Sequence, residues 1–89
     1  MASFGAAVVG DILVTIEEKT DGIYTRRYNI NNGQQILFSD GNAEKKVITT
    51  AVPFAQVPVD QGLIAIVLES DRSLWLSYDA GATFTKVTT

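Results

Sequence analysis

The sequence predicts a small all-β domain, an antiparallel β-sandwich or barrel of about six to eight short strands with hairpin connections. Apolar and polar residues alternate with a period of two along most of the chain, and turn-forming residues recur about every eight to twelve positions. No stretch places apolar residues at helical spacing. We expect residues 1–89 to form a single domain, because a chain of 89 residues is long enough for one core.

The stretch DILVTIEEKTDGIYTRRYNI, residues 11–30, predicts the first hairpin. In its first half, every second residue is β-branched and apolar: Ile12, Val14 and Ile16. Thr20–Gly22 supply the turn. The strand after the turn is expected to place Tyr24, Tyr28 and Ile30 on one side.

Three further segments are predicted in the middle of the chain. Asn31–Gly33 form the next turn, because Asn and Gly tolerate the backbone angles that a tight turn needs. A short strand is expected at residues 34–39, and Asp40–Asn42 turn the chain again. Residues 44–54 are rich in β-branched residues and predict another strand, which ends at Pro53 because proline cannot donate to a ladder.

The second half begins with an extended connection and continues with a strand that is apolar on both faces. Residues 53–62 contain both prolines and are expected to be an ordered connection between the two halves. Residues 63–68, LIAIVL, predict a central strand that must be covered on both sides, either inside one sandwich or by a second subunit. Residues 74–87 predict the final hairpin.

Composition argues against several classes of function. The net charge is −3 without a basic run, so nucleic acid is not an expected partner. Neither cysteine nor histidine is present, so thiolate or imidazole metal sites and histidine-based nucleophile arrangements are impossible. The carboxylates of the turns predict neither a paired acid and base nor a calcium loop, and no glycine-rich phosphate loop occurs. We therefore predict that the chain is not an enzyme and binds no cofactor or metal.

The N-terminal segment has no basic start, and its apolar run from Phe4 to Val9 is too short for a signal core or a membrane span. We expect a chain that is neither exported nor inserted in a membrane.

The last hairpin contains the pattern Ser-x-Asp-x-Gly-x-Thr-aromatic. Its members are predicted to build a structural turn: Ser77, Asp79, Gly81, Thr83 and Phe84. The Asp79 carboxylate is expected to accept backbone N–H groups, and the two hydroxyl groups to bridge the strands. Gly81 is expected to adopt a positive φ, and the Phe84 ring to pack beneath the turn with Trp75 or Leu76.

These residues resemble the Asp-box of sialidases and other β-propellers, with Phe84 where tryptophan is commoner. The resemblance covers about 14 of the 89 residues and implies a hairpin geometry, since the box lies away from the catalytic centre in those families. A propeller also needs several blades, and the chain has room for about one and a half. The resemblance therefore implies a local fold and no activity.

A candidate ligand face is predicted from flat aromatic rings and a nearby guanidinium: Tyr24, Arg26, Tyr28 and Trp75. Such a face suits a sugar or a protein surface. The alternative is that one or two of these rings lie in the core.

The favoured hypothesis is a non-enzymatic structural protein of a larger symmetric assembly. In general character the chain is similar to small all-β accessory proteins of bacteriophage virions, such as capsid-decorating (cement) proteins and tail components. That likeness implies a virion location, a major shell or tail protein as partner, and a homo-oligomer, dimer or trimer. Candidate contacts are an N-terminal arm, residues 1–10, and an edge strand: Phe4, Val8, Val9, Lys45 and Lys46.

Two alternatives remain open at this level. The first is a carbohydrate-binding or adhesion module, with a glycan as partner. The second is a phage tail component. A cytoplasmic location is the alternative to the virion.

Overall fold

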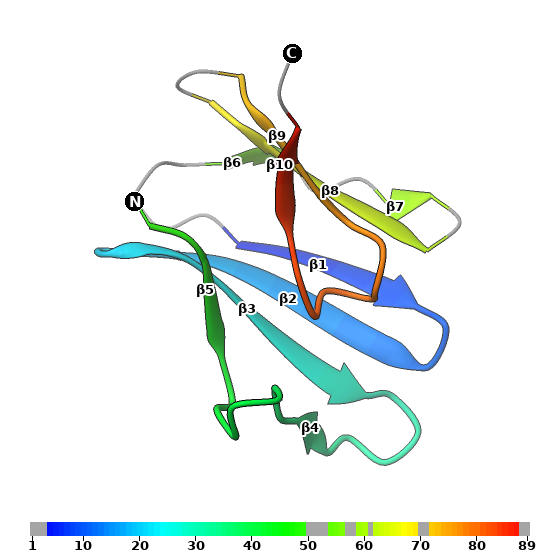
Figure 1. The fold of residues 1–89 in the computed structure, drawn as a ribbon. Helices are drawn as coiled ribbons and strands as arrows, with labels where there is room; N and C mark the ends of the chain where they lie inside the picture. Colours follow the sequence, from blue (N-terminus) through cyan, green and yellow to red (C-terminus); the bar gives the residue numbers. More distant parts are fainter. Residues whose placement is uncertain (1–3, 50–53, 57–58, 61, 70–71, 88–89) are drawn as a thin grey trace.

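A computed structural model describes residues 4–49, 54–56, 59–60, 62–69 and 72–87 of the chain. In these residues all regular structure is β-strand, arranged as two antiparallel sheets that lie in two layers (Figure 1). Eight strands contain three to eight residues, and two more contain two residues each. The predicted all-β antiparallel fold is confirmed.

The first sheet contains the N-terminal half of the chain. Its strands are β1 (Phe4–Val9), β2 (Ile12–Lys19), β3 (Gly22–Asn29), β4 (Gln35–Ile36) and β5 (Lys45–Ile48). The first three form a meander in the order β1-β2-β3. Both β4 and β5 pair with β3, at opposite ends of that strand. The expected hairpin of residues 11–30 is therefore the β2–β3 hairpin.

The second sheet contains the C-terminal half. Its strands are β6 (Phe54–Gln56), β7 (Val59–Asp60), β8 (Leu63–Leu68), β9 (Leu74–Ser77) and β10 (Thr85–Val87). Strand β8 is central: β9 pairs with one side of it, and β6 and β7 with the other. The last strand, β10, pairs with β9 and forms an edge.

A hydrophobic core lies between the two sheets. Its buried members come from both layers: Ala7, Val14, Ile16, Ile23, Ile48, Phe54, Ile64, Ile66 and Leu68. Partly buried side chains of Val9, Ile12, Val47, Trp75 and Phe84 pack against it. Side chains alternate between the faces of a strand, so the residues between these form the outer faces of the two sheets.

Three expected elements differ in extent. The segment 53–62 is more than a connection, because Phe54–Gln56 and Val59–Asp60 hydrogen-bond to β8 as strands. The strand expected at residues 34–39 is limited to Gln35–Ile36. The strand expected at 44–54 appears as Lys45–Ile48; Pro53, its predicted end, lies outside the described residues.

The expected N-terminal arm is largely an edge strand. Residues Phe4–Val9 pair along their full length with β2, because their alternation lets Ala7 enter the core while Phe4 and Val8 remain exposed on the outer face. Val9 points to the inner side and packs against the core. Residues 1–3 lie outside the described part.

The turn between β9 and β10 joins the two layers. Figure 1 shows this turn reaching over β2 of the first sheet. Gly81, at its tip, has φ +84°, and a Cβ placed on it would lie 2.6 Å from Cγ1 of Val14. Glycine is needed here both for its backbone angle and for the close contact with β2.

We predict that Gly81→Ala lowers the free energy of unfolding by about 2–4 kcal/mol, from backbone strain and from overpacking against Val14. The control is Gly41→Ala: Gly41 has φ +83°, and a Cβ placed on it would have nothing within 4 Å. This control should lose only the backbone part, about 1–2 kcal/mol. Urea unfolding of both variants measures the difference. Equal losses would mean that the contact with Val14 contributes nothing.

Candidate functional site

The candidate ligand face lies on the outer side of the first sheet, along β3. Tyr24, Arg26 and Tyr28 occupy alternate positions of this strand and project away from the core, whereas the neighbouring Ile23 and Thr25 are buried. All three outward side chains are half-buried. The strand therefore brings together three of the four residues predicted for this face.

Trp75 is separated from the other three. It lies opposite Ile66 in the β8–β9 ladder, so its ring is on the inner face of the second sheet and packs against the core. Its indole N–H donates to Ser73 Oγ at 3.3 Å. Of the two interpretations of the aromatic residues, Trp75 fits the one that places a ring against the core.

Glu44 is the centre of an ion-pair cluster beside this face. Its Oε2 lies 2.7 Å from Lys19 Nζ and 2.8 Å from Arg26 Nη2. The hydrogen bond from Lys19, followed by that from Arg26, lowers the pKa of the Glu44 carboxyl despite partial burial. Glu44 is thus held in its charged form and neutralised by two bases.

A second cluster surrounds Tyr24. Its hydroxyl donates to Asp21 Oδ2 at 2.7 Å, and Lys46 Nζ lies 3.2 Å from the same oxygen. The hydrogen bond from Tyr24 and that from Lys46 lower the pKa of Asp21. Lys19 Nζ is 4.8 Å and Lys46 Nζ 5.7 Å from the centre of the Tyr24 ring. The ammonium groups of Lys19 and Lys46 therefore lie beside the Tyr24 ring, where a ligand that stacks on the ring would have to bind.

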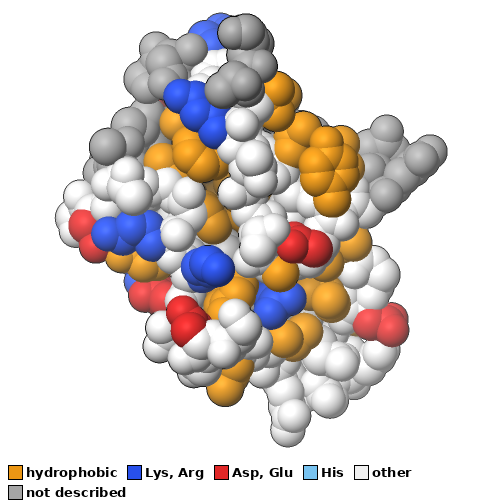
Figure 2. Space-filling model, viewed as in Figure 1, with side chains coloured by type: hydrophobic (Ala, Val, Ile, Leu, Met, Phe, Trp, Pro, Cys, Tyr) orange, Lys and Arg blue, Asp and Glu red, His pale blue; other side chains and the backbone are white. Residues whose placement is uncertain are grey.

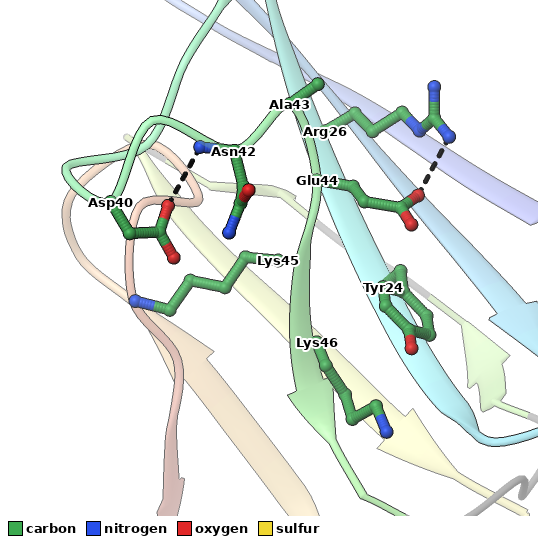
Figure 3. Close-up of a pocket in the computed structure, with 8 residues that line it drawn as sticks. All are labelled: Tyr24, Arg26, Asp40, Asn42, Ala43, Glu44, Lys45 and Lys46. Carbon is green, nitrogen blue, oxygen red and sulfur yellow. Dashed lines mark hydrogen bonds and ion pairs between the residues drawn. The ribbon is translucent and has the colours of Figure 1, made fainter.

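A shallow pocket of about 550 Å³ lies next to these clusters. Its walls are formed by β3, β5 and the loop before β5: Tyr24, Arg26, Asp40, Asn42, Ala43, Glu44, Lys45 and Lys46 (Figure 3). Asp40 Oδ1 accepts the backbone N–H of Asn42 at 3.0 Å. Figure 3 shows Lys45 and Lys46 leaving β5 in opposite directions, Lys45 toward Asp40.

The chemistry available in this pocket is that of a charged, polar surface. Basic and acidic side chains lie next to one another on the face seen in Figure 2, without a patch of one sign. Within the described residues, no group of three or more acidic, histidine or cysteine side chains converges as metal ligands do. Glu44 and Asp21 each have basic partners, so neither resembles a carboxyl held protonated as a general acid.

The remaining predicted contact residues lie in two places. Lys45 and Lys46 are on β5, which pairs with β3 at an edge of the first sheet, as expected for an edge strand. Phe4 and Val8 are exposed on the outer face of β1, at the other edge, whereas Val9 faces the core. The sheet therefore separates the two groups of candidates.

The turn at Ser77–Phe84, which we call the Asp79 turn, is held by hydrogen bonds to one carboxylate. Asp79 Oδ1 accepts the backbone N–H of Thr83 at 2.9 Å and the Ser77 hydroxyl at 2.9 Å, and Oδ2 accepts the Thr83 hydroxyl at 2.6 Å. Ser77 Oγ in turn accepts the backbone N–H of Gly81 at 2.9 Å. The hydroxyls thus meet at the carboxylate, rather than bridging strand to strand as expected.

These bonds also set the ionisation of Asp79. Burial by itself disfavours its charge, but the bonds from Thr83 and Ser77 outweigh burial and lower the pKa of the carboxyl. Ser77 is almost fully buried and Phe84 packs against the core, so the turn is integrated with the fold. Its partners account for Asp79 without a ligand.

The outer face of the second sheet is a further candidate surface, on the side of β8 that faces away from the core. Two cross-strand rows lie there, Ala65 beside Leu76 and Thr85, and Val67 beside Leu74 and Val87. We call these six residues the neutral face, because none is charged. The signal was present in residues 63–68, which are apolar on both faces, but the sequence did not show which strands would extend the rows.

Comparisons with known proteins give no relative: neither protein-family models, nor curated proteins, nor solved structures match the chain. Among the residues that the structure describes, no helix has the length and apolar character required to cross a membrane.

We predict that Asp79→Ala lowers the free energy of unfolding by about 1–2 kcal/mol at pH 7, because the carboxylate accepts three hydrogen bonds at a partly exposed site. Because the folded-state pKa lies below the ordinary value of 3.8, the contribution is present above that pH and disappears as pH falls through the folded value. Denaturant unfolding from pH 7 to pH 2.5 should show that the difference in free energy of unfolding between Asp79→Ala and wild type becomes smaller as the pH falls.

The control is Asp79→Asn, whose amide oxygen can still accept from Thr83, so its loss at pH 7 should be smaller. A wild-type advantage that is constant over the whole pH range would contradict the role assigned to the ionised carboxylate.

Proposed function

We propose that the chain is a non-enzymatic structural protein that acts by protein–protein contact in a larger symmetric assembly, with capsid decoration in a virion as the favoured role. The neutral face is the observation that carries this proposal. Its side chains are half-buried or exposed, and no described charge interrupts the two rows. A surface of this kind favours burial against another protein over contact with water.

The mechanism is the addition of interface area. A protein that binds only the assembled form of a shell stabilises that form by mass action and slows its opening. Stable contacts bury roughly 800 Å² on each partner, so the neutral face would be the centre of a larger contact with a polar rim. The partner would be a major shell or tail subunit that offers a complementary apolar surface.

The electrostatics of the other sheet also favour a structural role. Its outer face is populated by ion pairs that satisfy one another, in particular at Glu44 and Asp21. Paired groups of this kind contribute solubility and orientation, and their charges are already balanced within the chain. A tail component remains the nearest variant of this proposal, since it needs the same kind of contact.

A second candidate function is glycan binding, favoured by the placement of Tyr24, Arg26 and Tyr28 on one face beside a pocket. Two contacts weigh against it. The hydroxyl of Tyr24 is bonded to Asp21, and two ammonium groups lie within 6 Å of the ring centre. Sugar stacking would have to displace them, so we place this function second.

The proposal predicts that the chain cosediments with particles isolated from its source and that attachment depends on the neutral face. Leu74→Lys/Val87→Lys places two charges in one row and should weaken attachment of the purified chain to particles at least tenfold, about 1.4 kcal/mol. Ile30→Lys/Leu37→Lys is the matched control, because both of its side chains are exposed and belong to the half of the chain that forms the first sheet. Circular dichroism and unfolding curves check the fold of each variant.

Attachment of the neutral-face variant at wild-type strength would contradict the role of that face. Absence of the chain from every particle fraction would contradict the structural function itself.

The glycan alternative is tested by array binding of wild type and of Tyr24→Ala. We expect no signal above background from either. A glycan that binds wild type and is lost in Tyr24→Ala, with the fold intact, would reverse the order of the two candidates. Trp75→Ala is unsuitable here, because removing a ring that packs against the core would alter stability as well.

A further inference from the structure

The free edge of β1 differs from the other edges of the two sheets. Strand β1 ends the order of the first sheet, has six residues, and contains neither charge nor proline. The other described edges are protected: β5 contains Lys45 and Lys46, β10 contains Lys86, and β4, β6 and β7 have two or three residues. Lysines and short length are the usual means by which proteins prevent edge-to-edge pairing. Strand β1 has neither.

The alternation of hydrogen-bonded pairs between β2 and β3 shows which backbone groups of β1 point to the free edge. The Ile30 N–H donates to the Asp11 carbonyl at 2.9 Å, so this opposed pair is a hydrogen-bonded one. Hydrogen-bonded pairs alternate along an antiparallel ladder. The odd residues of β2 therefore bond to β3, and its even residues bond to β1 at Gly5, Ala7 and Val9.

It follows that the N–H and C=O groups of Phe4, Ala6 and Val8 point to the free edge. The same three residues have exposed side chains on the outer face, with Phe4 67% and Val8 55% exposed. Strand β7 contacts β1, and Gly62 lies near the Val9 side chain, so the Val9 end is engaged with the second sheet. Residues 4–8 are the part that a partner strand would use.

We propose that two copies of this chain pair through β1, antiparallel, about a twofold axis at Ala6. In this register Ala6 lies opposite Ala6 of the other copy, and Phe4 lies opposite Val8 on both sides of the axis. Each of these pairs consists of residues whose backbone groups point to the edge. In each pair, the N–H of either residue therefore donates to the C=O of the other. The outer faces of the two copies are then continuous.

The side chains favour a second copy as the occupant. The sequence around Ala6 is symmetric in size, with large apolar residues at positions 4 and 8 and small residues at positions 5–7. The small residues let the two backbones meet, and each Phe4 ring covers a Val8, an aromatic and β-branched cross-strand pair. An uncharged edge also complements itself, whereas a charged edge would repel its copy.

This inference rests on the proposed function for its biological setting. A dimer would present two neutral faces to a shell, and two linked contacts hold more strongly than one. The pairing itself is a property of the isolated chain, so it is measured without any particle.

The first test is the mass of the purified chain by light scattering over a hundredfold range of concentration. We expect a dimer, and we expect Val8→Lys to raise the dissociation constant at least a hundredfold, because it removes both Phe4–Val8 pairs and gives the edge a lysine of the kind that protects other edge strands. The matched control is Leu37→Lys, at a side chain that is 57% exposed away from β1. It should remain dimeric. A wild-type monomer at every concentration, or a dimer that Val8→Lys leaves intact, would overturn the proposal.

The second test reads the register. The chain has no cysteine, so single substitutions report one position each. Ala6→Cys should form a disulfide-linked dimer on oxidation with copper phenanthroline, because opposed hydrogen-bonded residues have Cα atoms about 5.5 Å apart. Val8→Cys alone should not, since its copy would lie about 13 Å further along the strand. Combined Phe4→Cys/Val8→Cys should link again.

A link at position 8 but not at position 6 would overturn the proposed register. Failure of the dimer and failure of the proposed function are distinguishable, because particle attachment is measured with the neutral-face variant. A monomeric chain that still attaches to particles would contradict only the proposed dimer. A dimer that never attaches to particles would contradict only the proposed structural role.

Discussion

The burial of β-branched side chains between the two sheets is the constraint that sets the arrangement of every surface in this molecule. Val14 and Ile16 of β2 and Ile64 and Ile66 of β8 are fully buried. A strand alternates its faces, so fixing these four residues inward also fixes every neighbour outward. The positions of Tyr24, Arg26 and Tyr28 on one surface, and of the neutral face on the other, follow from this parity.

Local hydrogen bonds and tertiary packing act together at the Asp79 turn. The bonds from Ser77 and Thr83 define the shape of the turn and come from residues close in sequence. Its place in the molecule is decided by Gly81, which lies against Val14 of the other sheet. A residue with a side chain would push the layers apart at this point. The turn is therefore a local motif used as a contact between sheets.

The surfaces differ in how far their side chains and backbone groups already interact with one another within the chain. Around Glu44 and Asp21, acids and bases pair within the molecule, so little electrostatic interaction remains for a partner. The neutral face and the edge of β1 lack such internal pairing. Apolar side chains gain by leaving water, and the edge backbone groups can bond to a partner strand in place of water. This contrast is why the proposals place partners there.

Local sequence patterns were enough to predict the all-β class, the hairpins, the central strand at 63–68 and the residues of the Asp79 turn, because alternation and turn chemistry act over a few residues. They were not enough to predict that residues 4–9 form an edge strand, that 54–56 add to the second sheet, or that Trp75 lies away from Tyr24. These features depend on which strands pair, and pairing is set by long-range packing of the core. The neutral face likewise exists only in the folded chain, since its rows join strands that are separate in the sequence.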